Sequence, residues 1–158
     1  ALAICSMKYK KFGKLDFKKL HPAGSLGAQL KTVEDIMITG NKIPFVREDL
    51  KMNLALKTLT KKKLGILIVL NKKNDTIGII TDGQIRRFTE KNANFQSLPV
   101  NKIMTKKPIS IGKDELAAKA LALMNNKKIT SLLVSRRENT KRTIGVIHIH
   151  TILQSNIS

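Results

Sequence analysis

Cysteine is nearly missing from this sequence, and tryptophan is absent altogether. The single cysteine, Cys5, excludes an internal disulfide and a cysteine-based metal cluster, and it fits the reducing cytoplasm in which we expect the protein to reside. Aromatic residues make up only 4% of the chain, so a core must be built from Ile, Leu, Val, Ala and Met. No apolar run is long enough to span a bilayer, which argues against a membrane protein.

Acidic residues are also scarce, with 11 Asp and Glu against 30 Lys and Arg, and the net charge is +19. Such a charge could indicate a nucleic-acid-binding protein. The lysines are scattered over the whole length, however, and the sequence contains no RNA-recognition, zinc-finger or KH pattern and no aromatic platform for bases. We therefore interpret the charge as solvated surface, with nucleic-acid binding as the less favoured alternative.

The opening residues, "ALAICSMKYKKF", lack an initiator Met and become basic too early for a signal peptide. This start predicts a segment cut from a longer polypeptide. Hydrophobic residues make up 42% of the 158, enough for one compact domain or two small, closely packed ones.

An internal repeat organises the chain. "DIM" at 35–37 returns as "KIM" at 102–104, and "TIGII" at 76–80 returns as "TIGVI" at 143–147, both at a shift of 67 residues. Between them, "LGILIV" at 64–69 aligns with "ITSLLV" after a shift of 65. Matching ends with small compensating changes inside loops indicate a duplicated structural unit.

Each copy predicts the element order β-α-β-β-α, which makes the fold class α/β with the two copies packed about a pseudo-twofold axis. We expect Glu48 or Asp49 to open the first helix and Asp114 to cap its counterpart in the second copy. The residues expected to face inward recur at helical spacing: Leu50, Leu54, Ala55 and Leu59 in the first copy, and Leu116, Ala117, Ala120, Leu121 and Met124 in the second. Met37 and Met104 occupy matching positions and are expected to pack between layers or subunits.

This order, with an apolar-Met opening and a "GIITDG" ending, resembles a tandem CBS pair, also called a Bateman module. The resemblance divides the chain into a tail and linker (1–32), a first CBS repeat (33–94) and a second (95–158). "DFKKLHPAGSLGAQL" at 16–30 further resembles the junction between the sugar isomerase (SIS) domain and the CBS pair in arabinose-5-phosphate isomerases.

The isomerase resemblance implies a cytoplasmic homotetramer that interconverts ribulose 5-phosphate and arabinose 5-phosphate on the way to Kdo and lipopolysaccharide. It places His21 at the active site, where it would help to move a proton between two sugar carbons. Because the phosphate-binding loop and the glutamates of that family are missing, these 158 residues are expected to be inactive alone.

The junction at 81–87 is the candidate ligand site of the first copy. In nucleotide-binding CBS pairs a Ser or Thr here meets phosphate, and an Asp three residues later binds the ribose; this chain has Thr81 and Gln84. Thr81, Arg86 and Arg87 form the anion-binding equipment of this copy, at a helix start whose dipole favours negative charge, and Asp82 is a further candidate ligand-binding residue. In the alternative interpretation, Asp82 merely caps the helix, Gly83 turns the chain and the arginines are solvated.

The second copy lacks both residues of that pattern, with His148 and Thr151 at the matching positions. His148 and His150 lie two apart on a predicted strand, so both should point to one face. A third ligand is missing, so we predict a cleft wall or plain surface rather than a metal site. The candidate ligand-binding residues are thus Thr81, Asp82, Gln84, Arg86, Arg87, Thr130, His148, His150 and Thr151.

The predicted role is regulation and assembly: a CBS pair that associates as a homodimer and senses a nucleotide or nucleotide sugar, such as CMP-Kdo or an adenine nucleotide. No cofactor is expected. The main alternative is a structural CBS scaffold without a ligand, which would explain the missing ribose carboxylates directly.

Overall fold

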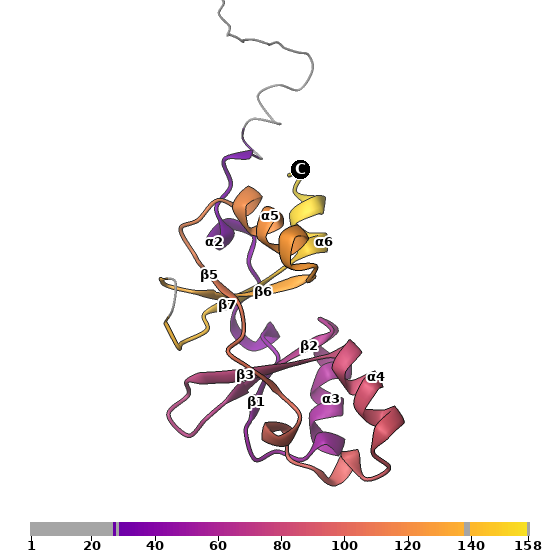
Figure 1. The fold of residues 1–158 in the computed structure, drawn as a ribbon. Coiled ribbons are helices and arrows are strands. Elements are labelled where there is room, and N and C mark those ends of the chain that lie inside the picture. The colour runs from indigo at the N-terminus through magenta and orange to yellow at the C-terminus, as the bar shows by residue number, and fades with distance from the viewer. Residues whose placement is uncertain (1–26, 28, 138–139, 158) are drawn as a thin grey trace, which may run out of the picture.

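Each copy of the repeat folds into a small sheet with helices on one face, and the bare faces of the two sheets meet (Figure 1). The computed structural model describes residues 27, 29–137 and 140–157. The predicted α/β class is confirmed, and so is the order β-α-β-β-α in both copies. The layers therefore stack in the order helices, first sheet, second sheet, helices.

In the first copy, strand β1 runs parallel to β2, and β2 and β3 form an antiparallel hairpin. Apolar residues fill β2, three of them β-branched, as expected for a strand that is buried on both faces. The elements are β1 (Phe45–Arg47), α3 (Met52–Lys62), β2 (Ile66–Leu70), β3 (Thr76–Thr81) and α4 (Asp82–Lys91).

The second copy repeats this pairing, with β5 parallel to β6 and β6 antiparallel to β7. Its elements are β5 (Ser110–Gly112), α5 (Ala117–Lys127), β6 (Ser131–Ser135), β7 (Gly145–His148) and α6 (Ile149–Gln154).

The segment that opens each copy lies on the sheet of the other copy. Strand β4 (Thr105–Lys106), at the start of the second copy, pairs with β3 of the first. Ile38, which matches Thr105 at the shift of 67, exchanges backbone hydrogen bonds of 2.8 and 3.0 Å with Val146 of β7. Short helices lie in both opening segments: α2 (Val33–Ile36) and η2 (Gly40–Lys42) before β1, and η3 (Phe95–Ser97) and η4 (Val100–Lys102) between α4 and β4.

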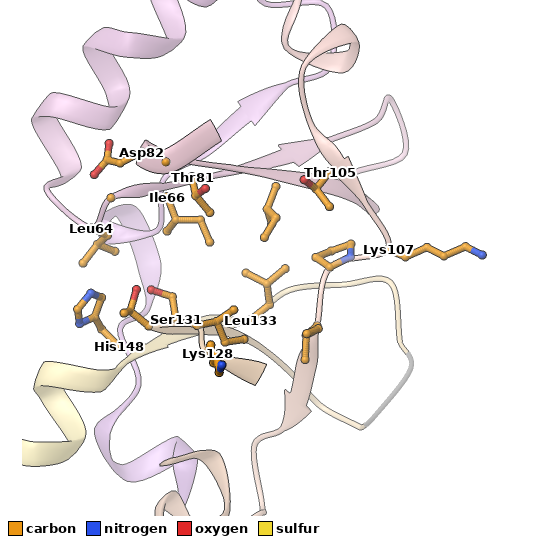
Figure 2. Close-up of a pocket in the computed structure, with 17 residues that line it drawn as sticks. Leu64, Ile66, Thr81, Asp82, Thr105, Lys107, Lys128, Ser131, Leu133 and His148 are labelled. Carbon is orange, nitrogen blue, oxygen red and sulfur yellow. The ribbon is translucent and has the colours of Figure 1, made fainter. Parts of the chain in front are cut away.

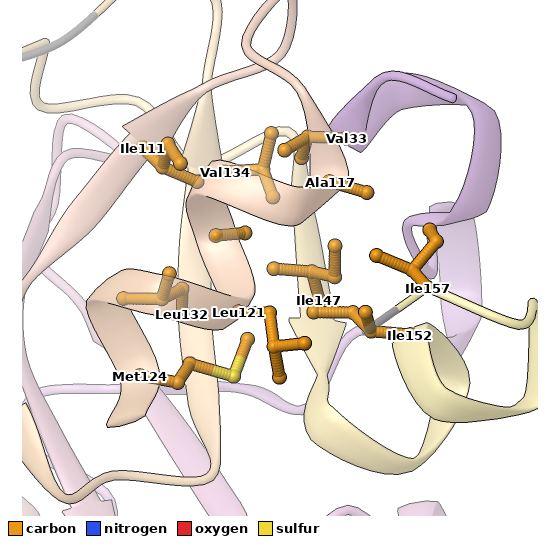
Figure 3. Close-up of a cluster of buried hydrophobic side chains, with 11 residues drawn as sticks. Val33, Ile111, Ala117, Leu121, Met124, Leu132, Val134, Ile147, Ile152 and Ile157 are labelled. Atoms are coloured by element: carbon orange, nitrogen blue, oxygen red, sulfur yellow. The ribbon is translucent and has the colours of Figure 1, made fainter. Parts of the chain in front are cut away.

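Residues of each opening segment are also buried in the hydrophobic core of the other copy. Val33 of α2 is fully buried in the core of the second copy, in one cluster with Val134 and Ala117 (Figure 3). Val100 and Ile103 are buried in the core of the first copy. A third cluster lies between the sheets and consists of Ile43, Ile66, Ile68, Leu133 and Val146.

Met37 and Met104 also cross between the copies. A Cβ on Gly78 would lie 2.5 Å from the sulfur of Met104, and a Cβ on Gly145 would lie 2.6 Å from the sulfur of Met37. Each methionine therefore packs on a glycine in the other copy, at positions related by the same shift. The expectation of packing between layers is confirmed.

The predicted helix starts are wrong. Helix α3 begins at Met52 after Lys51, and α5 begins at Ala117 after Leu116, so Glu48, Asp49 and Asp114 cap neither helix. No side chain caps these two starts because distant backbone does so: the Met52 N–H donates to the Leu98 carbonyl and the Ala117 N–H to the Lys31 carbonyl, both at 2.9 Å. Leu98 and Lys31 belong to the segments that open the two copies and lie on the sheet of the other copy; we call these the exchanged segments.

Most residues predicted to face inward do so, but Leu54 and Leu116 are exposed at 45% and 44%. Leu116 ends an extended segment outside its helix, and Leu54 sits on the solvent side of α3. Lys63 and Lys128 end α3 and α5 in the left-handed conformation.

The tips of the two hairpins are joined at the pseudo-twofold axis. Thr76 and Thr143, which are equivalent residues, share a 2.6 Å hydrogen bond between their hydroxyls. The Thr76 N–H donates to the Lys141 carbonyl at 2.7 Å, and the guanidinium of Arg142 pairs with the carboxylate of Asp75 at 3.2 Å. These contacts fix the two sheets relative to each other.

Candidate functional site

A cavity of about 580 Å³ opens between the two sheets, at the ends of β3 and β7 (Figure 2). We call it the inter-sheet cavity. It is bordered by the loops that follow α3 and α5, by the start of α4 and by the opening segment of the second copy. The boundary residues lie at 64–66, 81–83 and 128–131, with Thr105 and 107–109 from the opening segment and the side chains of Ile79, Leu133 and His148.

The cavity combines an apolar floor with a polar rim. Ile66 and Leu133 face each other across it from opposite sheets, and Thr81 and Ser131 place hydroxyls on its two sides (Figure 2). Lys128 also borders the cavity. Ligand sites are typically built this way, with apolar walls for a ring and a few polar groups for orientation.

Thr81 forms both the end of β3 and the cap of α4. Its Oγ1 accepts from the Gln84 N–H at 3.4 Å, and Gln84 Oε1 accepts from the Thr81 N–H at 3.0 Å, which together make a capping box. The cap of α4 is therefore Thr81 and not Asp82, and Gly83 is an ordinary helical residue instead of a turn. The alternative interpretation of this junction is wrong on these two points, whereas Arg86 and Arg87 are exposed, as it expected.

Gln84 stands where the family pattern has its ribose-binding Asp, but its side chain is engaged elsewhere. Its Nε2 donates to Thr105 Oγ1 at 2.5 Å and to the Ile103 carbonyl at 3.5 Å. Gln84 thus links the end of the first copy's sheet to the opening segment of the second. It does not border the inter-sheet cavity.

Asp82 lies at the cavity wall, over the loop that follows α3. Its N–H donates to the Gly65 carbonyl at 3.2 Å, and its carboxylate lies 2.9 Å from the position of a Cβ on Gly65. Gly65 has a φ of +69°, so both the backbone conformation and the close carboxylate require glycine here. Among the described residues that border the cavity, Asp82 carries the one carboxylate.

His148 takes the place of Thr81 in the second copy. Its Nδ1 accepts from the His150 N–H at 3.1 Å and so caps α6. The two rings stack with centroids 4.9 Å apart. The prediction that both histidines lie on a strand is wrong, because β7 ends at His148 and His150 is in the first turn of α6.

Partial burial, with a smaller contribution from His150, lowers the pKa of His148 below its ordinary value. At neutral pH the ring is therefore neutral, with Nδ1 as acceptor and Nε2 protonated. Among the residues that the structure describes, no group of three His, Cys, Asp or Glu side chains could hold a metal ion.

The structure brings four of the sequence-predicted residues together at this cavity: Thr81, Asp82, Thr130 and His148. Arg86 and Arg87 are exposed on α4, outside it. Gln84, His150 and Thr151 are not among the bordering residues. His21 lies outside the described residues.

Sequence reasoning missed Thr105, Lys107, Lys128 and Ser131 as cavity residues. The repeat itself carried the signal, because the segment after each "IM" and the segment after each first helix recur at fixed shifts. Three of these four segments border the cavity: the segment after the second "IM" and the segments after both first helices.

The model of the CBS domain family matches residues 33–91 and 100–157. The chain therefore belongs to the CBS domain family, and its two repeats form a CBS pair. In the described part of the chain, no helix is both long enough and apolar enough to cross a bilayer.

Among curated proteins, the chain is 37% identical over 147 residues to the uncharacterized protein RP505 of Rickettsia prowazekii, covering 93% of this chain and 44% of that protein. It is 35% identical over 158 residues to the arabinose 5-phosphate isomerase KdsD of Salmonella typhi, covering 99% of this chain and 47% of that protein. The chain spans somewhat less than half the length of these relatives.

Two similar solved structures contain adenosine ligands. The CBS pair of MJ0100, in complex with 5′-methylthioadenosine and S-adenosyl-L-methionine, aligns with a TM-score of 0.69 and 21% identity, covering 79% of this chain and 94% of the other. CBSX2 in complex with AMP aligns with a TM-score of 0.67 and 19% identity, covering 80% and 96%. At these identities the likeness shows the fold.

Proposed function

We propose that this CBS pair is the regulatory and assembly module of an arabinose-5-phosphate isomerase, and that its inter-sheet cavity binds a nucleotide or nucleotide sugar. The observation that carries the proposal is the cavity between the two sheets, where hydroxyls stand around an apolar floor and Lys128 is a bordering residue. The identity to the Salmonella isomerase and the adenosine ligands of two structural neighbours support it.

Regulation would act through the sheets. A ligand that contacts both copies favours one relative position of the sheets, and any attached domain would respond to that position. Sugar isomerisation itself is assigned in this proposal to the isomerase domain of the relatives, with His21 as the contribution from this chain. A cytoplasmic location belongs to the same proposal, and so does a homodimer of CBS pairs within a tetrameric parent.

Calorimetric titration of the chain at physiological salt, with CMP-Kdo, CMP, AMP and ATP in turn, tests the ligand. We expect selective binding of one of them, weakened about tenfold in Lys128→Gln because a charge-assisted contact to phosphate is lost. Lys127→Gln is the matched control, since Lys127 is the neighbouring helix residue and does not border the cavity. Equal losses in both variants, or no heat from any ligand, would contradict the proposal.

A ligand-free scaffold is the second candidate function, and one observation favours it. At the two positions where the family pattern offers a hydroxyl, Thr81 and His148 use their side chains as helix caps, and Gln84 is bonded to the opening segment of the second copy. Absence of heat in the titration would select this function.

A further inference from the structure

A second cavity, of about 620 Å³, lies beside the joined hairpin tips. We call it the hairpin cavity. Both hairpins contribute to it, together with the segment that connects β4 to β5. Its polar and charged border includes Asn71, Thr76, Lys106, Ser110, Lys141 and Thr143.

The segment from 105 to 110 separates this cavity from the inter-sheet cavity. Thr105 and Ile109 border the inter-sheet cavity, whereas Lys106 and Ser110 border the hairpin cavity. This alternation is that of an extended chain, in which successive side chains point to opposite sides. Residues 107–108 border both cavities, and so does Leu133 of β6. The two cavities are thus distinct and share one wall.

The charge at the hairpin cavity is strongly positive. Lys106, Lys107 and Lys141 border it, and within the described residues none of them forms an ion pair. Figure 2 shows the side chain of Lys107 extending away from the inter-sheet cavity. The carboxylate of Asp75, which also borders the hairpin cavity, is already paired with Arg142 at 3.2 Å. Three ammonium groups therefore remain to meet an anion.

The frame of the cavity is formed before any ligand arrives. The bonds between Thr76 and Thr143 and between Thr76 and Lys141 hold the hairpins together, at 2.6 and 2.7 Å. Ile77 and Leu133 supply apolar surface beside the charged border. A preformed frame reduces the ordering cost of binding, which leaves only the lysine side chains to be immobilised.

We propose that the hairpin cavity binds a small phosphorylated organic ligand. The lysines would hold the phosphate, and the hydroxyls and apolar surface would hold the organic part. This site is separate from the nucleotide site proposed above and does not depend on it.

Ribose 5-phosphate is a suitable probe, with ribose and inorganic phosphate as its two halves. We expect calorimetry on the full chain to show binding of ribose 5-phosphate that is at least about tenfold tighter than binding of either half. Backbone NMR shifts should move most at Thr76, Lys106 and Lys141. The double substitution Lys106→Gln/Lys141→Gln should weaken the affinity about tenfold, and Lys106→Arg/Lys141→Arg should retain it.

Lys128→Gln serves as the crossed control, because Lys128 borders only the inter-sheet cavity. It should leave ribose 5-phosphate binding unchanged, while the Lys106→Gln/Lys141→Gln protein should still bind any nucleotide that the wild type binds. The proposal is overturned if ribose or inorganic phosphate binds as tightly as ribose 5-phosphate. Equal binding by the Gln double variant, or shifts confined to the inter-sheet cavity, would overturn it as well.

Discussion

Thr81 and His148 occupy equivalent positions in the two copies, and both cap the helix that follows their strand. A hydroxyl can accept a hydrogen bond at any pH, whereas an imidazole nitrogen accepts only when it is unprotonated. The second copy therefore has a titratable cap where the first has a permanent one. Protonation of Nδ1 would remove the bond to the His150 N–H and add positive charge at a helix N-terminus.

The sign of the pH effect follows from the lowered pKa of His148. The unfolded chain binds a proton at the ordinary value of 6.5, and the folded chain binds it only at lower pH. The contribution of His148 to the free energy of unfolding is thus complete above pH 6.5 and is lost as the pH falls through the folded pKa. Urea unfolding at about pH 7.5 and about pH 5.5 measures this loss.

His148→Thr is the matched variant, because it installs the residue that caps the equivalent helix. We expect it to retain most of the stability at about pH 7.5 and to lose less of it than the wild type at about pH 5.5, since its cap does not titrate. Carboxylates titrate equally in both proteins and cancel in the comparison. If the free energy of unfolding depended on pH identically in the two proteins, protonation of His148 would not affect stability.

At the scale of elements, the contact between Gln84 of α4 and Thr105 of β4 joins the two copies beside the inter-sheet cavity. Gln84→Ala removes this bond and half of the capping box, so we expect it to lower the free energy of unfolding by about 1–2 kcal/mol. Thr105→Val removes only the acceptor and keeps the shape of the side chain.

A double-mutant cycle with Gln84→Ala and Thr105→Val isolates the contact. Denaturant unfolding should give a coupling energy of about 1 kcal/mol between the two positions. Additive losses would mean that Gln84 acts through the helix cap alone.

The main strands and helices were predictable because the duplication repeats each hydrophobic pattern in the sequence. Strands such as β2 and helices such as α5 are long enough for their periodicity to be read. The exchanged segments were not predictable: β4 has two residues and Ile38 forms an isolated bridge, so neither carries a period. The wrong caps have the same origin, since Lys31 and Leu98 satisfy the helix starts from more than forty residues away along the chain.

The candidate site was predictable where one strand end carries its own signal, as at Thr81 and Asp82. It was not predictable where the border depends on how the copies meet, as at Thr105 and Ser131. Gln84 shows the limit of a motif: the position is right, but the structure turns its side chain to the opening segment of the other copy.

For the whole molecule, the outer helices keep apolar side chains at the surface. Leu54 of α3, Leu116 before α5 and Leu153 of α6 are each between 44% and 51% exposed. The interior clusters are already closed between the sheets and under the helices, so these side chains are available to a second copy of the chain. Leu54 lies on the first copy and Leu116 and Leu153 lie on the second, so the proposed homodimer would form through the outer helices of both copies.

Sedimentation velocity at high micromolar concentration should give the mass of a dimer. Changing Leu54, Leu116 and Leu153 together to Lys should weaken the dimer by about tenfold or more, because apolar contact area is replaced by like charges.

The matched control places three lysines at exposed polar positions of the same or neighbouring helices: Asn53, Thr89 and Gln154. It adds the same charge and should stay dimeric. A monomeric wild type at this concentration would refute the assembly, and equal dissociation of both variants would show that charge alone had caused the effect.

Because the opening segments are exchanged, neither copy contains by itself all the residues of its hydrophobic core. Val33 fills the interior of the second copy, and Val100 and Ile103 fill that of the first. A single copy expressed on its own would lack the opening segment of the other copy. The place of that segment in the core would be open to the opening segment of a second molecule. Two such halves would complete each other reciprocally, as a domain-swapped pair that rebuilds the parent architecture from two identical chains. The duplicated chain can thus be regarded as that swapped pair made permanent by one covalent connection.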